Sequence, residues 1–499
     1  MKKWILFALA LCLIIWHHIF YVQAPPADAI QLEQNYKYKL LLVPLDSRPP
    51  CQKMVIDAGK MAGVQVIVPP SEIMDYYTKK GDTKALQQWL LDNIGSADGA
   101  IISVDQLLHG GLLASREIDT QKQDIQQIDS YLKLLRKKAP NKDLYVFNVL
   151  PRITPPPTIK SKSKDIIKIS RLIDQISIFE NEQDIKDLEK LKEKVDPDDL
   201  NIYLDLFKQN TQLNKVLINL TKDHTINKLI IGQDDGEDFG IPNMEKKALQ
   251  AYLRANEIND QQVMITKGAD EVALSLLADF VQTKTTYKPK VYVAYNDDSA
   301  ERTIMPFMAG SVGTTVNEKL IMANALQVDN PEEADIILYV FIGNDENIAS
   351  QEASALKIKS YIESGKSVAL VDLSEHFLAR ETVFPKLIQN DVPLNALTAY
   401  AGWNTASNSI GTALANAIIY NAQKTQNQST NDRLALEYNR LKINYNRYLE
   451  DYYYLKEVID VINTTLHKYG YTNVNDLDMN HNYLWMNDLL QKDMRQRAL

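Results

Sequence analysis

The feature that most constrains the fold of this chain is the alternation of short apolar runs with longer amphipathic stretches. The runs are rich in β-branched residues and apolar on both faces, as buried parallel strands are, and the stretches between them have helical periodicity. This pattern predicts an α/β fold of mostly parallel strands with covering helices, arranged as two α/β units or as a barrel with extra strands. The expected strands span residues 39–45, 64–68, 99–104, 144–149, 228–232, 262–266, 290–295, 335–341, 367–373 and 396–400.

Breaks in this alternation divide the chain into regions. Residues 158–225 hold charged amphipathic stretches and no strand, so they are expected to form a helical insertion within a first α/β unit, residues 36–285. A polar stretch near the end of that unit precedes a second α/β unit at 286–425. Residues 430–499 are again helical in pattern and rich in tyrosine, which predicts a C-terminal helical cap.

The N-terminal segment has the pattern of an export sequence. Lys2 and Lys3 precede an apolar run at residues 4–16, and the small-residue sequence Ala27-Asp28-Ala29 follows. Residues 1–29 are therefore predicted to be a signal peptide or an N-terminal membrane anchor. The expected location is extracytoplasmic, either secreted or anchored to the outer face of the cytoplasmic membrane, with membrane contact only through this segment.

Charge, cysteine content and motifs exclude several classes of protein. The net charge is −9 and the charged residues are mixed in sign, whereas a nucleic-acid partner would require a basic stripe. Of the two cysteines, Cys12 lies in the N-terminal segment, which leaves Cys51 without a disulfide partner in the mature chain. No nucleophile elbow, P-loop, zinc-protease or dinucleotide-binding motif is present. A small-molecule or saccharide substrate is favoured.

Carboxylates gather in the loops that follow the predicted strands, where parallel α/β proteins bind their ligands. Asp46 follows the first strand, Asp105 the third, and the sequence QDDGED, with Asp234 and Asp235, the fifth. Three explanations are open for the loop at 233–238. It holds a hard cation such as Mg²⁺ or Ca²⁺, it supplies a general acid and a general base, or it is a solvated acidic turn before a helix.

Three of these loops each carry one arginine, namely Arg48, Arg116 and Arg152. Guanidinium groups pair with carboxylates and phosphates through two parallel hydrogen bonds. These arginines therefore either bind an anionic group of the substrate or neutralise the neighbouring aspartates within the protein.

Residues 402–414, GWNTASNSIGTAL, stand where a strand runs into a helix. Asn404 and Asn408 offer amides that donate and accept hydrogen bonds, and Trp403 offers an aromatic face, a combination that suits a polyhydroxylated ligand. The alternative is an elaborate helix N-cap with Trp403 packed inside the protein. Three further polar residues of strand-end loops complete the predicted substrate-binding set, namely Gln233, Asp270 and Glu271.

The motifs VPLDSRPP, GAIISVDQLLHGGLLASR, IIGQDDGEDFG, KGADEVALSLLA and LTAYAGWNTASNSIGTALA together resemble the motif series of the DUF4127 family of bacterial proteins. The resemblance extends from residue 38 to about residue 420. It implies a shared fold and no particular activity, because the family has no established function. The residues that match its motifs are Asp46, Arg48, Asp105, Gly110, Gly111, Arg116, Arg152, Gln233, Asp234, Asp235, Gly268, Asp270, Glu271, Tyr400, Gly402, Trp403, Asn404 and Asn408.

The first hypothesis from the sequence is an exported hydrolase of a glycan or cell-envelope saccharide. Asp234 or Asp235 would act as acid or base, Asp46 or Asp105 as its partner, and Trp403 with Asn404 and Asn408 would position the sugar. The second hypothesis is a non-catalytic exported protein that binds a solute or glycan. The third is a metal-dependent esterase or phosphoesterase, which would need the cation at 233–238; no other cofactor or metal is expected.

Overall fold

The computed structural model describes residues 34–76, 79–117, 122–344, 348–426, 429–472, 476–477 and 482–498. The predicted signal peptide or anchor at residues 1–29 lies outside this part of the chain. Among the described helices, none combines the length and the apolarity that a membrane span requires.

The first sheet contains six strands in the order β2-β1-β3-β4-β5-β6, and every pairing is parallel. The predicted periodicity placed all six close to their observed positions. Their bounds are β1 (Tyr38–Val43), β2 (Val64–Ile67), β3 (Gly99–Ser103), β4 (Asp143–Leu150), β5 (Lys228–Gln233) and β6 (Val263–Lys267).

The second sheet contains five parallel strands in the order β11-β10-β9-β7-β8. Its first strand, like that of the first sheet, lies between its second and third strands, so both sheets reverse their strand order at the corresponding place. The bounds are β7 (Lys290–Tyr295), β8 (Leu326–Gln327), β9 (Ile336–Gly343), β10 (Ser367–Ser374) and β11 (Ala399–Ala401).

These two parallel sheets with their helices confirm the predicted α/β fold, and they show two sheets rather than a barrel. The sequence pattern missed β8, because its two residues are exposed and no apolar run marks them. It also placed the last strand too early. Leu394–Ala396 forms a 3₁₀ turn, and β11 begins only at Ala399.

Alternating side chains of each sheet enter different cores. In β1, Leu40 and Leu42 join a core that also contains residues of the second sheet, whereas Leu41 and Val43 join a core on the opposite face. The second core lies under the outer helices of the first sheet, which are α3 (Thr83–Asn93), α5 (Lys122–Lys138), α8 (Pro197–Lys222) and α9 (Ile241–Ala255).

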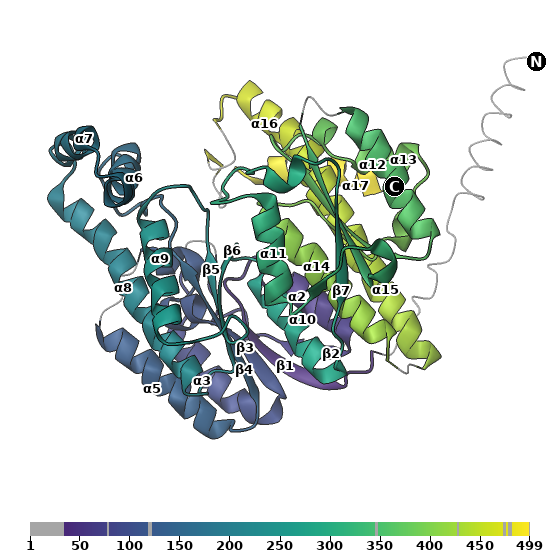
Figure 1. Ribbon diagram of the computed structural model, residues 1–499, viewed down its shortest axis with the longest axis horizontal. Helices are drawn as coiled ribbons and strands as arrows, with labels where there is room; N and C mark the ends of the chain where they lie inside the picture. The colour runs from purple at the N-terminus through teal and green to yellow at the C-terminus, as the bar shows by residue number, and fades with distance from the viewer. Residues whose placement is uncertain are drawn as a thin grey trace, which may run out of the picture.

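The shared core between the two sheets contains the helices that face both of them (Figure 1). These helices are α2 (Lys53–Ala62), α10 (Val272–Thr285), α11 (Val312–Met322) and α14 (Ala406–Lys424). Helix α14 is buried along residues 406–423, as expected of a helix that is covered on all sides. The far face of the second sheet packs on α12 (Ile348–Glu363) and α13 (Phe384–Gln389).

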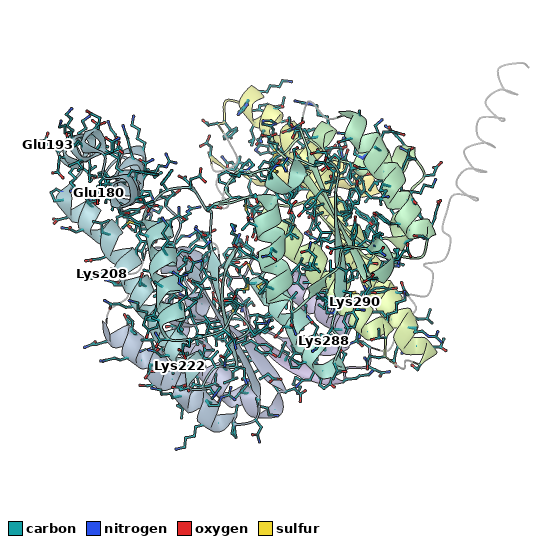
Figure 2. The ribbon with its side chains drawn as sticks, in the orientation of Figure 1. Glu180, Glu193, Lys208, Lys222, Lys288 and Lys290 are labelled. Carbon is teal, nitrogen blue, oxygen red and sulfur yellow. The ribbon has the colours of Figure 1, made fainter. Side chains whose placement is uncertain are left out.

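Helices without strands occupy residues 158–225, as the sequence predicts. Helices α6 (Ser163–Phe179), α7 (Glu182–Lys192) and the first half of α8 form a small core of their own, and Figure 2 shows Glu180 and Glu193 at the end that projects away from the first sheet. The C-terminal region is also helical, as predicted. It contains α15 (Thr430–Arg447), a π-helix (Tyr448–Val458), α16 (Ile459–Lys468) and α17 (Leu484–Ala498).

Candidate functional site

A pocket lies at the carboxyl ends of the first sheet's strands, where the second sheet's loops meet them. Asp234 and Asp235 follow β5, and Asp270 follows β6. Asn404 and Asn408 line the same pocket from the loop after β11 and the first turn of α14. Of the residues predicted from sequence, the structure therefore gathers these five, together with Gln233, around one space.

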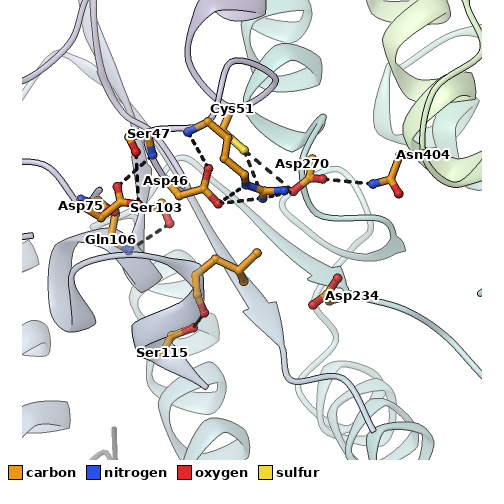
Figure 3. A network of polar contacts seen from close by, with 12 residues as sticks. Asp46, Ser47, Cys51, Asp75, Ser103, Gln106, Ser115, Asp234, Asp270 and Asn404 are labelled. Atoms are coloured by element: carbon orange, nitrogen blue, oxygen red, sulfur yellow. Dashed lines mark hydrogen bonds and ion pairs between the residues drawn. The ribbon is translucent and has the colours of Figure 1, made fainter. Parts of the chain in front are cut away.

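The loop after β1 holds Asp270 of the pocket wall through Arg48. Figure 3 shows Asp46, Asp270 and Asn404 in one row of polar contacts. Arg48 Nε donates to Asp46 Oδ2 at 2.8 Å, and its Nη2 donates to Asp270 Oδ1 at 2.7 Å. The other oxygen of Asp270 accepts from Asn404 Nδ2 at 3.3 Å. Asp270 thus connects the loop after β1 to the loop after β11, across the two sheets.

The turn after β1 explains why Arg48 points this way. Asp46 Oδ1 accepts from the backbone N–H of Arg48 at 3.0 Å, which is an Asx-turn. Cys51 follows this turn, is fully buried, and its Sγ lies 3.8 Å from both Arg48 Nη2 and Asp270 Oδ1. Burial raises the pKa of the Cys51 thiol, so it is a packed side chain rather than a reactive thiolate.

The two aspartates after β5 have different surroundings. Asp234 forms an ion pair with Arg116, and both side chains are largely buried. Asp235 is more open, with 37% of its side chain exposed, and its Oδ2 lies 3.6 Å from Arg152 Nη1. Burial raises the pKa of Asp235, and the charge of Asp234 raises it further against the opposing effect of Arg152.

All three predicted arginines therefore pair with carboxylates of the site. The structure thus shows the internal pairing for each guanidinium group, whereas binding of an anionic group of the substrate stays a prediction.

Asp105 does not face this pocket. It is 2% exposed, and its Oδ2 accepts from the backbone N–H of Val149 at 3.0 Å, which ties the loop after β3 to β4. Burial raises the pKa of Asp105 to about 7. Asp75, which the sequence analysis did not single out, holds the loop after β1 from the other side by accepting from the Ser47 backbone N–H at 2.9 Å.

Trp403 does not line the pocket either. Its indole is 6% exposed and belongs to the shared core, and its Nε1 donates to Thr412 Oγ1 at 3.2 Å. Of the two interpretations of this stretch, the packed one describes Trp403. The aromatic ring that lines the pocket is Phe307, in the loop between β7 and α11, whose side chain is 58% exposed.

Glu271 and Gln233, two residues predicted to bind substrate, have buried partners. Glu271 Oε1 accepts from Lys319 Nζ at 2.5 Å, and both side chains are fully buried. Gln233 lines the pocket while its Nε2 donates to Asn243 Oδ1 at 3.3 Å. Lys267, which is not among the predicted site residues, also lines the pocket and pairs with Glu318 at 2.5 Å.

Residues with positive φ also occur at this pocket. Ten described residues other than glycine have positive φ, and six of them follow a helix end by one or two residues, where this conformation is common. The other four are Asp235, Phe307, Phe377 and Asn404. Three of these line the pocket. Unusual backbone conformations that are not helix ends concentrate at functional sites.

A cation at the 233–238 loop stays a prediction from the sequence. Among the described residues, no group of three or more His, Cys, Asp or Glu side chains is arranged to hold a metal ion.

The fold and the pocket define a class: α/β proteins of two parallel sheets that share a core and place paired aspartates and arginines at the strand ends. The chain belongs to the DUF4127 family, described as a protein of unknown function, whose model matches residues 40–498. Neither the curated proteins nor the solved structures compared with the chain gave a match.

Proposed function

We propose that this protein is an exported hydrolase that cleaves a glycosidic bond in a cell-envelope saccharide. The observation that carries the proposal is the placement of Asp235 and Asp270 around one pocket, together with the amides of Asn404 and Asn408. The loops that hold the two aspartates follow the neighbouring strands β5 and β6, and neighbouring strands lie about 4.8 Å apart. Glycoside hydrolysis uses two carboxyl groups that flank the scissile bond.

The two carboxyl groups differ in their exposure and in their distance from the nearest guanidinium group. Asp235 is partly exposed, its nearest guanidinium nitrogen lies 3.6 Å away, and its pKa is raised by burial. It is suited to hold a proton and donate it to the leaving-group oxygen. Burial raises the pKa of Asp270 as well, but Arg48, whose Nη2 lies 2.7 Å from Asp270 Oδ1, opposes this effect and favours the ionised form, so we assign Asp270 as the second carboxylate.

This assignment moves the partner role from Asp46 or Asp105 to Asp270. Both oxygens of Asp46 accept hydrogen bonds from Arg48, and Asp105 is buried against β4. We assign Asp46 and Arg48 a positioning role for Asp270. The N-terminal pattern of Lys2 and Lys3 followed by an apolar run supports the extracytoplasmic location.

One observation favours a second candidate, a non-catalytic protein that binds a solute or glycan. Asp234, Asp235 and Asp270 each already have an arginine partner. A site in which every carboxylate is neutralised can bind a neutral ligand through its amides without any proton transfer.

The experiment compares the mature wild-type chain, from residue 30, with Asp235→Asn and Asp270→Asn. Binding of bacterial cell-wall saccharides is followed by the shift in thermal unfolding, and hydrolysis by the release of reducing ends. Asp298→Asn is the matched control, because Asp298 is an exposed aspartate in the loop after β7.

We expect both site variants to keep binding and to lose hydrolysis by a factor of about 10² to 10⁴, the range that general acid–base catalysis contributes. The control should hydrolyse at the wild-type rate. Unchanged hydrolysis by Asp235→Asn would overturn the assignment of the acid. A saccharide that binds wild type and Asp235→Asn equally and is never cleaved would favour the binding protein.

A further inference from the structure

A second pocket adjoins the first and shares Asn404 and Thr405 with it. It lies at the carboxyl ends of β10 and β11, and its wall includes Phe377, Ser374 and Lys456. The two pockets thus have one common wall but are bordered by different elements.

Lys456 is the charged residue that lines this second pocket. It lies in the π-helix Tyr448–Val458, and wide helical turns of this kind occur frequently at functional sites. Only 3% of the residue is exposed, and Nζ lies 4.5 Å from the centre of the Phe377 ring. Within the described part of the chain, this ammonium group has no hydrogen bond and no ion pair. Burial of an ammonium group is costly, and the charges of Asp372, Asp451 and Glu381 offset part of that cost without forming an ion pair with it.

Three carboxylates lie near Lys456, but other groups satisfy them. Asp451 accepts from Arg447 Nη1 at 2.8 Å and from the backbone N–H of Gly402 at 2.9 Å. Asp372 accepts from two backbone N–H groups and from the hydroxyl of Tyr400. Glu381 accepts from a backbone N–H at 2.8 Å and from a serine hydroxyl at 2.9 Å. None of the three lines the second pocket.

The backbone conformation and the exposure of Phe377 support the interpretation of the second pocket as a ligand-binding site. It is one of the four loop residues with positive φ, and 36% of its side chain is exposed. An aromatic ring with an exposed surface beside a cation offers a sugar an apolar face and offers its charged substituent a counter-ion.

We propose that Lys456 and Phe377 form a second subsite that binds a negatively charged substituent, a carboxylate, on a sugar next to the one held in the first pocket. The substrate class is then an acidic saccharide, an inference that rests on the proposed function. The walls of the two pockets differ in charge. The first contains Asp234, Asp235 and Asp270, each paired with an arginine, whereas the only charged residue among the described ones in the second pocket's wall is a cation, which attracts an anion.

The test measures binding of three probes by isothermal titration: a short oligosaccharide of galacturonic acid, its neutral methyl ester, and inorganic phosphate. Wild type is compared with Lys456→Met and with Lys456→Arg, which keeps the charge. Lys357→Met is the matched control, because Lys357 is an exposed residue of α12 whose Nζ lies 4.9 Å from the centre of the Tyr361 ring. Lys456→Gln, with circular dichroism of every variant, covers the case in which Lys456→Met does not fold.

We expect wild type, Lys456→Arg and Lys357→Met to bind the acid roughly tenfold more tightly than its ester, as a charge-assisted hydrogen bond would produce. This preference should be lost in Lys456→Met and in Lys456→Gln. Tighter binding of phosphate than of the acid would overturn the choice of a carboxylate. Equal binding of acid and ester by wild type, or no binding of any probe, would overturn the subsite.

Failure of the proposed function and failure of the subsite would give different results in these measurements. If wild type prefers the acid through Lys456 but never cleaves it, the subsite stands and the hydrolase assignment fails. If Asp235→Asn abolishes cleavage while acid and ester bind alike, the hydrolase stands and the subsite fails.

Discussion

The two sheets share a strand order but satisfy their buried carboxylates in different ways. At the strand ends of the first sheet, Asp270 pairs with the guanidinium group of Arg48, and Asp234 pairs with that of Arg116. At the end of β10 in the second sheet, Asp372 instead accepts from the backbone N–H groups of Val383 and Phe384, at 2.9 and 3.2 Å.

The difference explains which sheet presents charge to the pocket. Arginine side chains reach across from other loops, and Arg48 itself is half-exposed, so the carboxylates they hold stay at the pocket wall. Asp372 accepts instead from two backbone N–H groups and the Tyr400 hydroxyl inside the protein, where its exposure is 0%. The first sheet therefore presents carboxylates to the pocket, while the buried carboxylate of the second sheet joins β10 to the start of α13.

The largest effect that we expect comes from breaking the contact between the two regions. Lys319 of α11 and Glu271, at the start of α10, form a fully buried ion pair. Lys319→Met would leave the Glu271 carboxylate without its cation and should lower the free energy of unfolding by about 3 to 5 kcal/mol. Denaturant unfolding measures this loss.

The matched control for this prediction replaces both partners, as Lys319→Met with Glu271→Met. It should recover most of the lost stability, because an apolar pair of similar volume leaves no buried charge unpaired. A single variant as stable as wild type would show that this pair does not hold the two sheets together.

The next-largest effect that we expect is a dependence of stability on pH, caused by Asp105 after β3 of the first sheet. The pKa of Asp105 is raised by burial to about 7, so the folded chain keeps a proton that the unfolded chain loses near pH 4. The stability associated with this proton is complete below about pH 4 and is lost as the pH rises through 7. Asp105→Asn should therefore gain stability relative to wild type over this range, by up to about 4 kcal/mol.

Thermal unfolding of both proteins at pH 4, 5.5, 7 and 8 measures this difference. The amide introduced by Asp105→Asn keeps an oxygen that can accept from the Val149 backbone N–H, so the variant should not lose that bond. A difference between the two proteins that does not change with pH would contradict the prediction.

The smallest of these effects belongs to the second sheet. Burial raises the pKa of Asp372 to about 6, against the lowering effect of its backbone donors. The stability linked to its proton is complete below about pH 4 and is lost as the pH rises through 6. The relative gain of Asp372→Asn should therefore be smaller, up to about 3 kcal/mol, and should level off about one pH unit earlier than that of Asp105→Asn. A stability gain of Asp372→Asn that is larger than that of Asp105→Asn, or that levels off at higher pH, would contradict the predicted difference between the two sheets.

The fold could be predicted from the sequence because parallel strands that are buried on both faces appear in it as short continuous apolar runs. The run at residues 335–341, for example, predicted β9, whose side chains are buried throughout. The rule that ligands bind at strand ends also brought Asp234, Asp235, Asp270 and Asn404 to one pocket. The three aspartates are adjacent in space because the parallel strands β5 and β6 end at the same edge of the first sheet. Asn404 meets them from the second sheet, where it follows β11.

Side-chain direction within those loops could not be predicted. Asp105 and Asp234 both follow a strand, but Asp105 turns back to a backbone N–H of β4 while Asp234 reaches the pocket. Nor did the sequence indicate Phe307 or Lys456. Phe307 lies in the loop between β7 and α11 and lines the first pocket. Lys456 lies on a C-terminal helix that reaches the second pocket only through tertiary packing.

The start of the described chain has a consequence for orientation. Gln34 donates to the Lys60 carbonyl and accepts from Asn439 Nδ2, just before β1 begins at Tyr38. It therefore lies at the amino ends of the strands, and the pocket lies at their carboxyl ends. A tether formed by the N-terminal segment would therefore join the fold at the end of the strands opposite the pocket.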